Sequence, residues 1–155
     1  MLHLIPVGFH RWALRTAHRL RSRFRRVAKP HLAGVSVILR DDEGRVLLAR
    51  HSYGPRGWAS VGGGLKAGEE PEAALRREVR EELGCEIERI EKVGTFHETL
   101  SGAPHTAHIY TARPVDPVEV DGRELVAARW FGREELAEAD LTRPTRARLI
   151  RLGLL

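Results

Sequence analysis

The chain has little cysteine, no long apolar run and, over its first thirty residues, no acid. Cys85 is the only cysteine among 155 residues, so no internal disulfide can form and nothing argues for an oxidising compartment. No apolar run approaches the roughly 18 residues that cross a bilayer, so we expect no membrane span. From these two absences we expect a cytoplasmic protein.

Acidic residues are missing from residues 1–30, which hold eight of the 26 lysines and arginines. The other 18 basic and 21 acidic residues give residues 31–155 a net charge of about −3, although the whole chain carries +5. A chain of 155 residues suits one domain with a buried core. We therefore expect a basic appendage at residues 1–30 and one mildly acidic domain at residues 31–155.

Residues 8–30 predict one basic amphipathic helix, ended by Pro30, because apolar and arginine residues each recur at steps of three or four. The apolar face holds Phe9, Ala13, Ala17, Leu20, Phe24 and Val27, and the basic face holds Arg11, Arg15, Arg19, Arg23 and Arg26. Such a helix could pack on its own domain or on the mate in a homodimer, lie on an anionic membrane, or contact nucleic-acid phosphates. We favour packing against protein.

Two observations limit what this helix indicates. A transit peptide is also rich in arginine and free of acid, yet nothing here resembles a cleavage site. Arginine outnumbers lysine 23 to 3 across the chain, so a high arginine content does not by itself indicate a specific partner.

Strand-like segments dominate the middle of the chain, and helical segments flank them. We predict strands at residues 32–40, 45–50, 58–61, 85–98, 104–115 and 125–131, with turns or loops at 41–44, 51–70, 99–103 and 115–124. Helices are predicted at residues 71–83, 133–139 and 144–152. The fold class is therefore α+β, or a mixed α/β/α sandwich.

The helix at residues 71–83 carries an unusual group of carboxylates. At 100° per residue, Glu78, Glu81 and Glu82 lie within about a 100° arc, beside the apolar stripe. A solvated face with ion pairs is the ordinary explanation of such a run. However, the like-charged (i, i+4) pair Glu78 and Glu82 should cost a few tenths of a kcal/mol. A hard divalent cation such as Mg²⁺ would explain the pair, and spacing alone leaves both explanations open.

The residues around this helix resemble the signature of the Nudix hydrolases. The pattern runs Gly63, five residues, Glu69, seven residues, Arg77-Glu78-Val79, one residue, Glu81-Glu82, one residue and Gly84. Residues 35–50 and 124–136 resemble the flanks of a Nudix domain, so the resemblance covers roughly residues 31–155. Two positions depart from the pattern: Cys85 fills the closing apolar position, and Val61 stands where proline often precedes the glycines.

The resemblance implies a Nudix-like α/β/α sandwich with a mixed sheet. It also implies hydrolysis of the pyrophosphate linkage in a nucleoside diphosphate joined to another group, with Mg²⁺ or Mn²⁺ as cofactor. The substrate would be an NTP, a nucleotide sugar, ADP-ribose or a dinucleoside polyphosphate. Two alternatives stay open: a nucleotide-sensing module without turnover, and an enzyme acting on RNA 5′ ends with help from the basic helix.

Roles carry over to this chain position by position. Glu78, Glu81 and Glu82 would bind metal together with the Gly63 carbonyl, and Glu78 or a later acid would orient or deprotonate water. Arg77 and Glu69 would be supports, and Gly84 ends the helix. Gly62, Gly63, Gly64 and Arg50 are expected at the substrate, because glycines let backbone approach phosphate.

Other polar and aromatic residues are weaker candidates. Glu124 stands where some family members place a further metal-binding or catalytic acid, with Glu98 the second choice. Histidines at positions 51, 105 and 108 are more often packed than ligands of a hard ion. Trp58, Tyr53 and Phe96 could stack on a base, although aromatics in strands usually build the core. Substrate choice is expected in the loops at residues 52–56, 99–104 and 114–123.

Overall fold

The computed structural model describes residues 7–28, 32–100 and 102–155, and within residues 7–28 the side chains of residues 8 and 11–20. The predicted helix end at Pro30 and the side chains of Phe9, Phe24, Val27, Arg23 and Arg26 lie outside the described part. Among the described residues, no helix is both long and apolar enough to cross a membrane.

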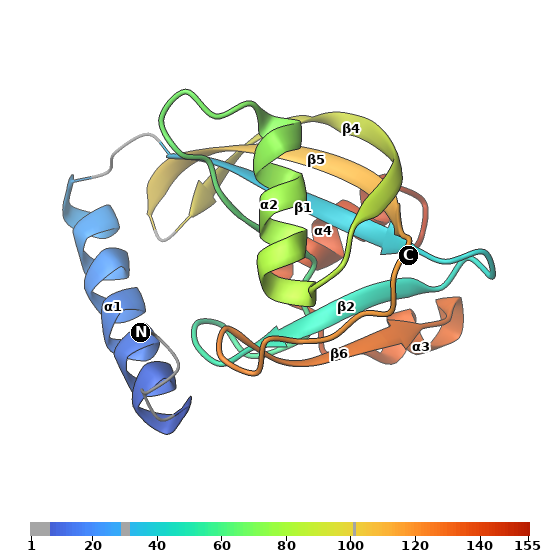
Figure 1. Ribbon diagram of the computed structural model, residues 1–155. Coiled ribbons are helices and arrows are strands. Elements are labelled where there is room, and N and C mark those ends of the chain that lie inside the picture. Colours follow the sequence, from blue (N-terminus) through green and yellow to red (C-terminus); the bar gives the residue numbers. More distant parts are fainter. Residues whose placement is uncertain (1–6, 29–31, 101) are drawn as a thin grey trace.

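The described chain forms one mixed β-sheet with helices on both faces and a further helix beside it (Figure 1). The helices are α1 (Val7–Ala28), α2 (Pro71–Leu83), α3 (Arg133–Glu138) and α4 (Arg143–Arg151). The strands are β1 (Leu32–Arg40), β2 (Val46–His51), β3 (Val61–Gly64), β4 (Ile87–Leu100), β5 (Ala103–Pro114) and β6 (Leu125–Phe131). The order in the sheet is β4-β5-β1-β2-β6, with β3 also paired to β1. Only the β1–β5 pairing is parallel among these, so the expected mixed sheet is confirmed.

Alternation along the strands divides the core into two layers. Val35, Val37 and Leu39 of β1 pack against Leu75 and Val79 of α2. Ile38 of β1, on the other face, packs with Leu136 of α3 and Leu149 of α4. The helix α2 therefore packs on one face of the sheet, and its position is fixed above β1 and β3.

The ends of α2 follow the predicted signals. Pro71 is the first helical residue, where its missing N–H costs no hydrogen bond. Gly84 adopts a left-handed conformation with φ 63°, and its N–H donates to the carbonyl of Arg80. Both ends of the helix therefore lie at the residues, Pro71 and Gly84, that the sequence predicted.

The glycine run differs from the prediction. Residues 58–61 were expected to form the short strand and residues 62–64 a turn, yet β3 consists of Val61–Gly64. Trp58 and Ala59 form only isolated bridges, to Leu141 and Ala49. The reason is contact with β1: a Cβ on Gly62 would lie 2.1 Å from the carbonyl oxygen of Val35. These glycines are strand residues that allow an unusually close backbone approach.

The loop predicted at residues 99–103 is also shorter than expected. β4 continues to Leu100 and β5 begins at Ala103, and their register pairs Leu100 with Ala103. The two strands form a long hairpin whose tip lies close to the end of α1 that leads into β1 (Figure 1).

Candidate active site

Two glutamates of α2 lie against the glycine strand. Glu78 and Glu82 are one helical turn apart, and the backbone N–H of Gly62 lies close enough to the Glu82 carboxyl to oppose the rise in its pKa. A Cβ on Gly63 would lie 2.4 Å from the Glu78 carboxyl carbon. Glu82 is only 5% exposed, and one of its oxygens, Oε2, has no hydrogen-bond partner among the described residues. The absence of a side chain on Gly63 therefore makes the space in which the Glu78 carboxylate lies.

Arg77 holds the surrounding acids in place. Its Nε and Nη2 donate to the two carboxylate oxygens of Glu69 at 2.8 and 3.0 Å, a bidentate pair. Its Nη1 donates to Glu78 Oε1 at 2.7 Å and, more weakly, to Glu81 Oε2 at 3.4 Å. Its Nη2 also donates to the carbonyl of Gly64 at 3.1 Å. One guanidinium thus joins the loop before α2, the glycine strand and the helix, as a support for Glu78.

Burial changes the protonation of these groups. Burial, followed by the charges of Glu78 and Glu124, raises the pKa of Glu82 to about 9. Burial also raises the pKa of Glu78, although hydrogen bonds from Arg77 oppose this. In contrast, hydrogen bonds from Arg77 lower the pKa of Glu69 to about 2. The supporting acid stays ionised, while the two inner acids are unstable as bare anions and would be stabilised by a cation.

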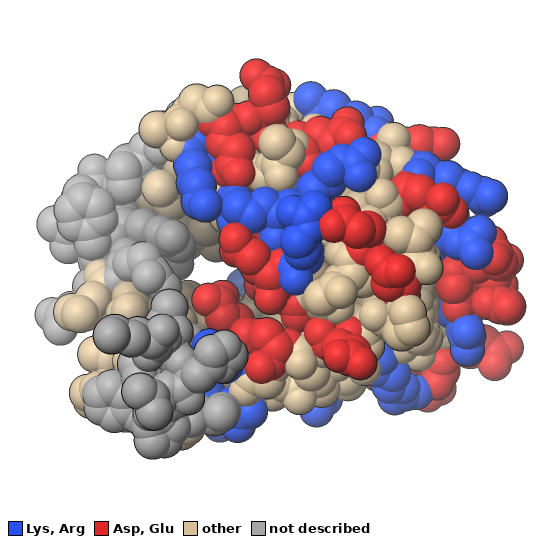
Figure 2. All heavy atoms as spheres, viewed as in Figure 1, with Lys and Arg blue, Asp and Glu red and all other residues tan. Residues whose placement is uncertain are grey.

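A loop after β5 brings a second group of acids to the same place. The N–H groups of Glu119 and Asp121 donate to the carbonyls of Leu83 and Glu82, which fixes this loop against the C-terminal end of α2. The Asp121 carboxylate accepts hydrogen bonds from the backbone of residues 123–125. Glu124 thereby lies within electrostatic reach of both Glu78 and Glu82. Acidic side chains consequently gather beside α2, facing the opening toward α1 (Figure 2).

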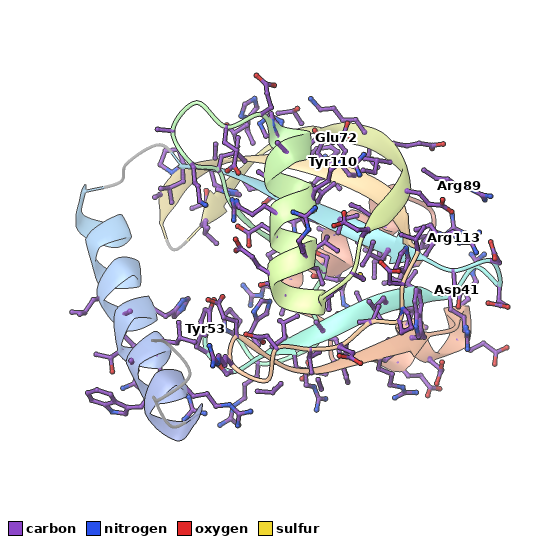
Figure 3. All side chains as sticks on the ribbon, in the orientation of Figure 1. Asp41, Tyr53, Glu72, Arg89, Tyr110 and Arg113 are labelled. Carbon is purple, nitrogen blue, oxygen red and sulfur yellow. The ribbon has the colours of Figure 1, made fainter. Side chains whose placement is uncertain are left out.

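Glu124 is oriented from the opposite side by the loop after β2. The hydroxyl of Tyr53 donates to Glu124 Oε2 at 3.0 Å, and the backbone N–H of Ser52 donates to the Glu124 carbonyl. His51 lies nearby, and its burial lowers the pKa of the imidazole, so the ring is neutral at pH 7. Tyr53 lies between the body and α1 (Figure 3).

The donor set suits a hard divalent cation. Carboxylates and a backbone carbonyl are the oxygen ligands that Mg²⁺ and Mn²⁺ prefer, and the partnerless Oε2 of Glu82 is one such oxygen. Within the described ranges, no three acidic, histidine or cysteine side chains are grouped closely enough to hold an ion by themselves. Arg77 engages Glu78 and Glu81, and the Glu81 side chain is 58% exposed. A cation here would therefore take further oxygens from water or substrate, as Mg²⁺ commonly does.

The structure does not bring every candidate to this cluster. Arg50 stacks on the ring of Trp58, with its guanidinium carbon 4.4 Å from the ring centroid, and Trp58 packs on Phe131 in the core beneath α3 and α4. The role of Arg50 at the substrate stays a prediction. Glu98 accepts a hydrogen bond from Arg148 of α4 at 3.0 Å, on the face away from α2.

The remaining candidates have structural partners. His105 lies 3.7 Å from Glu98, and His108 shares a hydrogen bond with Thr95. Phe96 lies under the guanidinium of Arg151. The sequence did not point to Asp121, because an acid in a loop is not distinguished from other loop acids by sequence. Only the structure shows that its backbone N–H is hydrogen-bonded to α2. The turn sequence Asp121-Gly122 was its one available signal.

Comparison with known proteins agrees with this geometry. A family model described as the NUDIX domain matches residues 30–152. The human protein NAD(P)H pyrophosphatase NUDT13, mitochondrial, is 37% identical over 113 residues, which are 71% of this chain and 32% of that protein. An RNA pyrophosphohydrolase from Methylococcus capsulatus is 44% identical over 64 residues, which are 41% of this chain and 33% of that protein. This chain thus spans about a third of the length of these two relatives.

A solved structure extends the agreement to the fold. The crystal structure of a MutT NUDIX hydrolase from Burkholderia pseudomallei superposes with a TM-score of 0.71 at 27% identity, over 79% of this chain and 98% of that one. The helix α1 precedes the residues that the family model matches.

Proposed function

This chain belongs to the NUDIX family, and on that premise we propose that it hydrolyses the pyrophosphate linkage of a nucleoside diphosphate joined to another group, with Mg²⁺ or Mn²⁺ as cofactor. The two relatives described above support the choice of bond, since one is named for NAD(P)H and the other for RNA pyrophosphate cleavage. Their different substrates leave the second group of the nucleotide open.

The observation that carries this proposal is the Glu82 carboxylate. It is nearly fully buried, lacks a partner for Oε2 within the described ranges, and lies beside Glu78 and Glu124 rather than beside a described basic residue. Burying a carboxylate without compensation costs several kcal/mol, as a rough measure. A site that keeps such a group near two other acids is suited to binding a cation.

The residues of the chain divide the work of the reaction between them. Glu78, Glu82 and Glu81 would hold the metal, whose chemistry is to neutralise phosphate charge and to acidify a bound water. Arg77 fixes the orientation of Glu78, and Glu69 fixes Arg77. The glycines of β3 let the diphosphate approach the backbone closely.

The general base is one of two carboxylates. Glu78 lies on the metal-binding side of α2, and Arg77 holds its carboxylate in place through Oε1. Glu124 lies opposite, held by Tyr53, and could accept the water's proton at Oε1, the oxygen that Tyr53 does not bind. We propose Glu78 or Glu124 for this role.

The proposal is tested with Glu82→Gln. The substitution keeps the shape of the side chain and removes its charge, so we expect metal-dependent release of phosphorylated product to fall more than about 100-fold, beyond the loss typical of an outer-shell change. The assay screens NTPs, nucleotide sugars, ADP-ribose and dinucleoside polyphosphates with Mg²⁺ and with Mn²⁺.

The matched control is Glu72→Gln, an exposed glutamate near the start of the same helix that pairs with Arg76 (Figure 3). It should keep full activity. Full activity in Glu82→Gln would overturn the proposed mechanism, and tight binding of these compounds by the wild type without turnover would show a sensing module instead.

A further inference from the structure

A large groove separates α1 from the loop after β2. Its volume is about 940 Å³, within the range of sites that hold nucleotide-sized ligands. One wall is the middle of α1, including Arg15, His18 and Arg19, and the other wall consists of residues 51–56. Figure 2 shows an opening between α1 and the body, with acidic side chains on the rim at the body side.

The groove is held open by specific contacts between α1 and the body. Arg11 donates from Nε and Nη2 to the carbonyl of Gly122 at 3.0 and 2.7 Å. Arg15 donates from Nε to the carbonyl of Ser52 at 2.9 Å. The ring of His18 lies 5.3 Å from that of Tyr53. The first arginines of the basic face therefore dock the helix, and they dock it through backbone carbonyls that no substrate would displace.

Two other arginines line the groove without an ion-pair partner in the described part of the chain. Arg19 of α1 and Arg56 of the loop make no ion pair with any residue that the structure describes, and the described lining of the groove contains no acidic side chain. Elsewhere in the described part, arginines such as Arg45, Arg77 and Arg113 pair with acids. Guanidinium groups that line a concave surface without a paired acid favour an anion, and phosphate matches their planar geometry.

The groove reaches the catalytic acids through Tyr53. This residue lines the groove, and its hydroxyl donates to Glu124, which lies within electrostatic reach of Glu78 and Glu82. The acids that would hold the metal repel the rest of an anionic substrate. A basic groove at their edge would offset that repulsion for phosphates that lie away from the scissile bond.

We propose that this groove binds a phosphate group of the substrate beyond the pyrophosphate that is cleaved, through Arg19 and Arg56. The assignment rests on the proposed function, because it places the rest of the substrate relative to the acids of α2. The helix α1 would then contribute to substrate specificity, because nucleotides that carry an additional phosphate would be preferred over those that do not.

A membrane surface fits the geometry less well. Arg19 and Arg56 lie on opposite walls of a concave groove, one on α1 and the other on the loop after β2, whereas a bilayer presents a flat surface. The exposed apolar residues of α1, Trp12 at 60% and Leu20 at 63%, are too few in the described part to form a continuous membrane-facing stripe.

The test measures binding without turnover. Fluorescently labelled ATP and a 5′-triphosphorylated RNA decamer are titrated with the full chain in EDTA, at several salt concentrations. In the double variant Arg19→Ala/Arg56→Ala we expect the Kd to weaken about tenfold or more, and the slope of log K against log [salt] to fall by about one for each arginine. Neither arginine has a described partner, so melting temperature should be unchanged.

The control is Arg40→Ala/Arg133→Ala, which removes the same charge from the end of β1 and the start of α3, at the end of the sheet opposite residues 51–56. Weaker binding by the groove variant alone supports the proposal. Weaker binding of both ATP and RNA means that the bound phosphate belongs to a mononucleotide. Weaker binding of RNA alone means that it belongs to an extended strand. Equal weakening in both double variants, or none, would overturn it. Phosphatidylglycerol vesicles are titrated in the same way. The proposal would also be overturned if the groove variant bound both nucleotide probes normally and lost only its binding to these vesicles.

Failure of this proposal is distinct from failure of the proposed function. If no compound is hydrolysed but the groove variant binds more weakly, the hydrolase assignment fails and the phosphate groove stands. If hydrolysis depends on Glu82 and groove binding is unaffected by the double variant, only the groove assignment fails.

Discussion

At the scale of single residues, the site depends on the absence of a side chain at Gly63. The space that a Cβ would occupy there is filled by the Glu78 carboxylate, 2.4 Å from the ideal Cβ position to both the carboxyl carbon and Oε1. The glycine and the glutamate are therefore packed together, and a side chain at position 63 would displace the Glu78 carboxylate.

Gly63→Ala should damage catalysis more than folding. The atom it meets is the end of a flexible side chain, so Glu78 can rotate away at a cost within the roughly 1–3 kcal/mol typical of overpacking. A displaced Glu78 loses its hydrogen bond from Arg77, and we expect kcat/KM to fall at least about tenfold.

Gly64→Ala is the comparison variant, because a Cβ there meets nothing within 4 Å. Steady-state kinetics and thermal melts on both variants check the expectation. A loss in Gly64→Ala as large as that in Gly63→Ala would show that the effect comes from the strand backbone and not from Glu78.

The spacing of the acids could be predicted from sequence, but their burial could not. Helical periodicity correctly places Glu78, Glu81 and Glu82 on neighbouring parts of α2. It does not distinguish Glu81, whose side chain is 58% exposed, from Glu82, which is 5% exposed. That difference arises from β3 and the loop at residues 115–124, which are remote in sequence and cover only one side of the helix.

At the scale of elements, α2 shows where local signals suffice. Pro71 and Gly84 mark its ends because each reflects a backbone requirement that one residue meets alone. The glycines of β3 were harder to interpret, since glycine is common in turns and its use in a strand depends on the neighbouring β1 backbone. Sequence patterns therefore predict elements that depend on local residues, such as α2, and miss elements that depend on a neighbouring strand, such as β3.

Replacing Gly84 should destabilise the end of α2. Its φ of 63° is left-handed, and Gly84→Ala should lower the free energy of unfolding by about 1 kcal/mol. A Cβ there would lie 3.6 Å from the nearest atom, the Glu119 carbonyl oxygen, so strain in the backbone and not collision is the cause.

Urea denaturation measures this change. Gly8→Ala provides the reference, because Gly8 lies in α1 with nothing within 4 Å of an added Cβ, and this substitution should not lower stability. An unchanged midpoint in Gly84→Ala would contradict the expected backbone strain.

At the scale of the whole molecule, stability should depend on pH through Glu82. Its pKa is about 9 when folded, against an ordinary value of 4.5. Between these values the unfolded chain releases a proton that the folded chain keeps, so the metal-free protein loses up to about 1.4 kcal/mol for each pH unit of increase. Below about pH 4.5 the carboxyl is neutral in both states and this penalty vanishes.

Glu82→Gln removes the ionisation and hence the penalty. At pH 8 in EDTA we expect the variant to melt about 5 °C or more above the wild type, and at pH 4.5 the difference should be much smaller. Added Mg²⁺ should raise the melting temperature of the wild type and not of the variant. Equal melting temperatures across this pH range would mean that Glu82 has an ordinary pKa.

The single cysteine gives the molecule a practical property. Cys85 is 2% exposed, and burial, followed by nearby acidic charges, raises the pKa of its thiol to about 11, so at neutral pH it is both covered and protonated. A thiol introduced on the surface, for example Gly8→Cys on α1, would be the one that reacts with a maleimide dye. The native chain is therefore ready for single-site fluorescent labelling, with no cysteine to remove first.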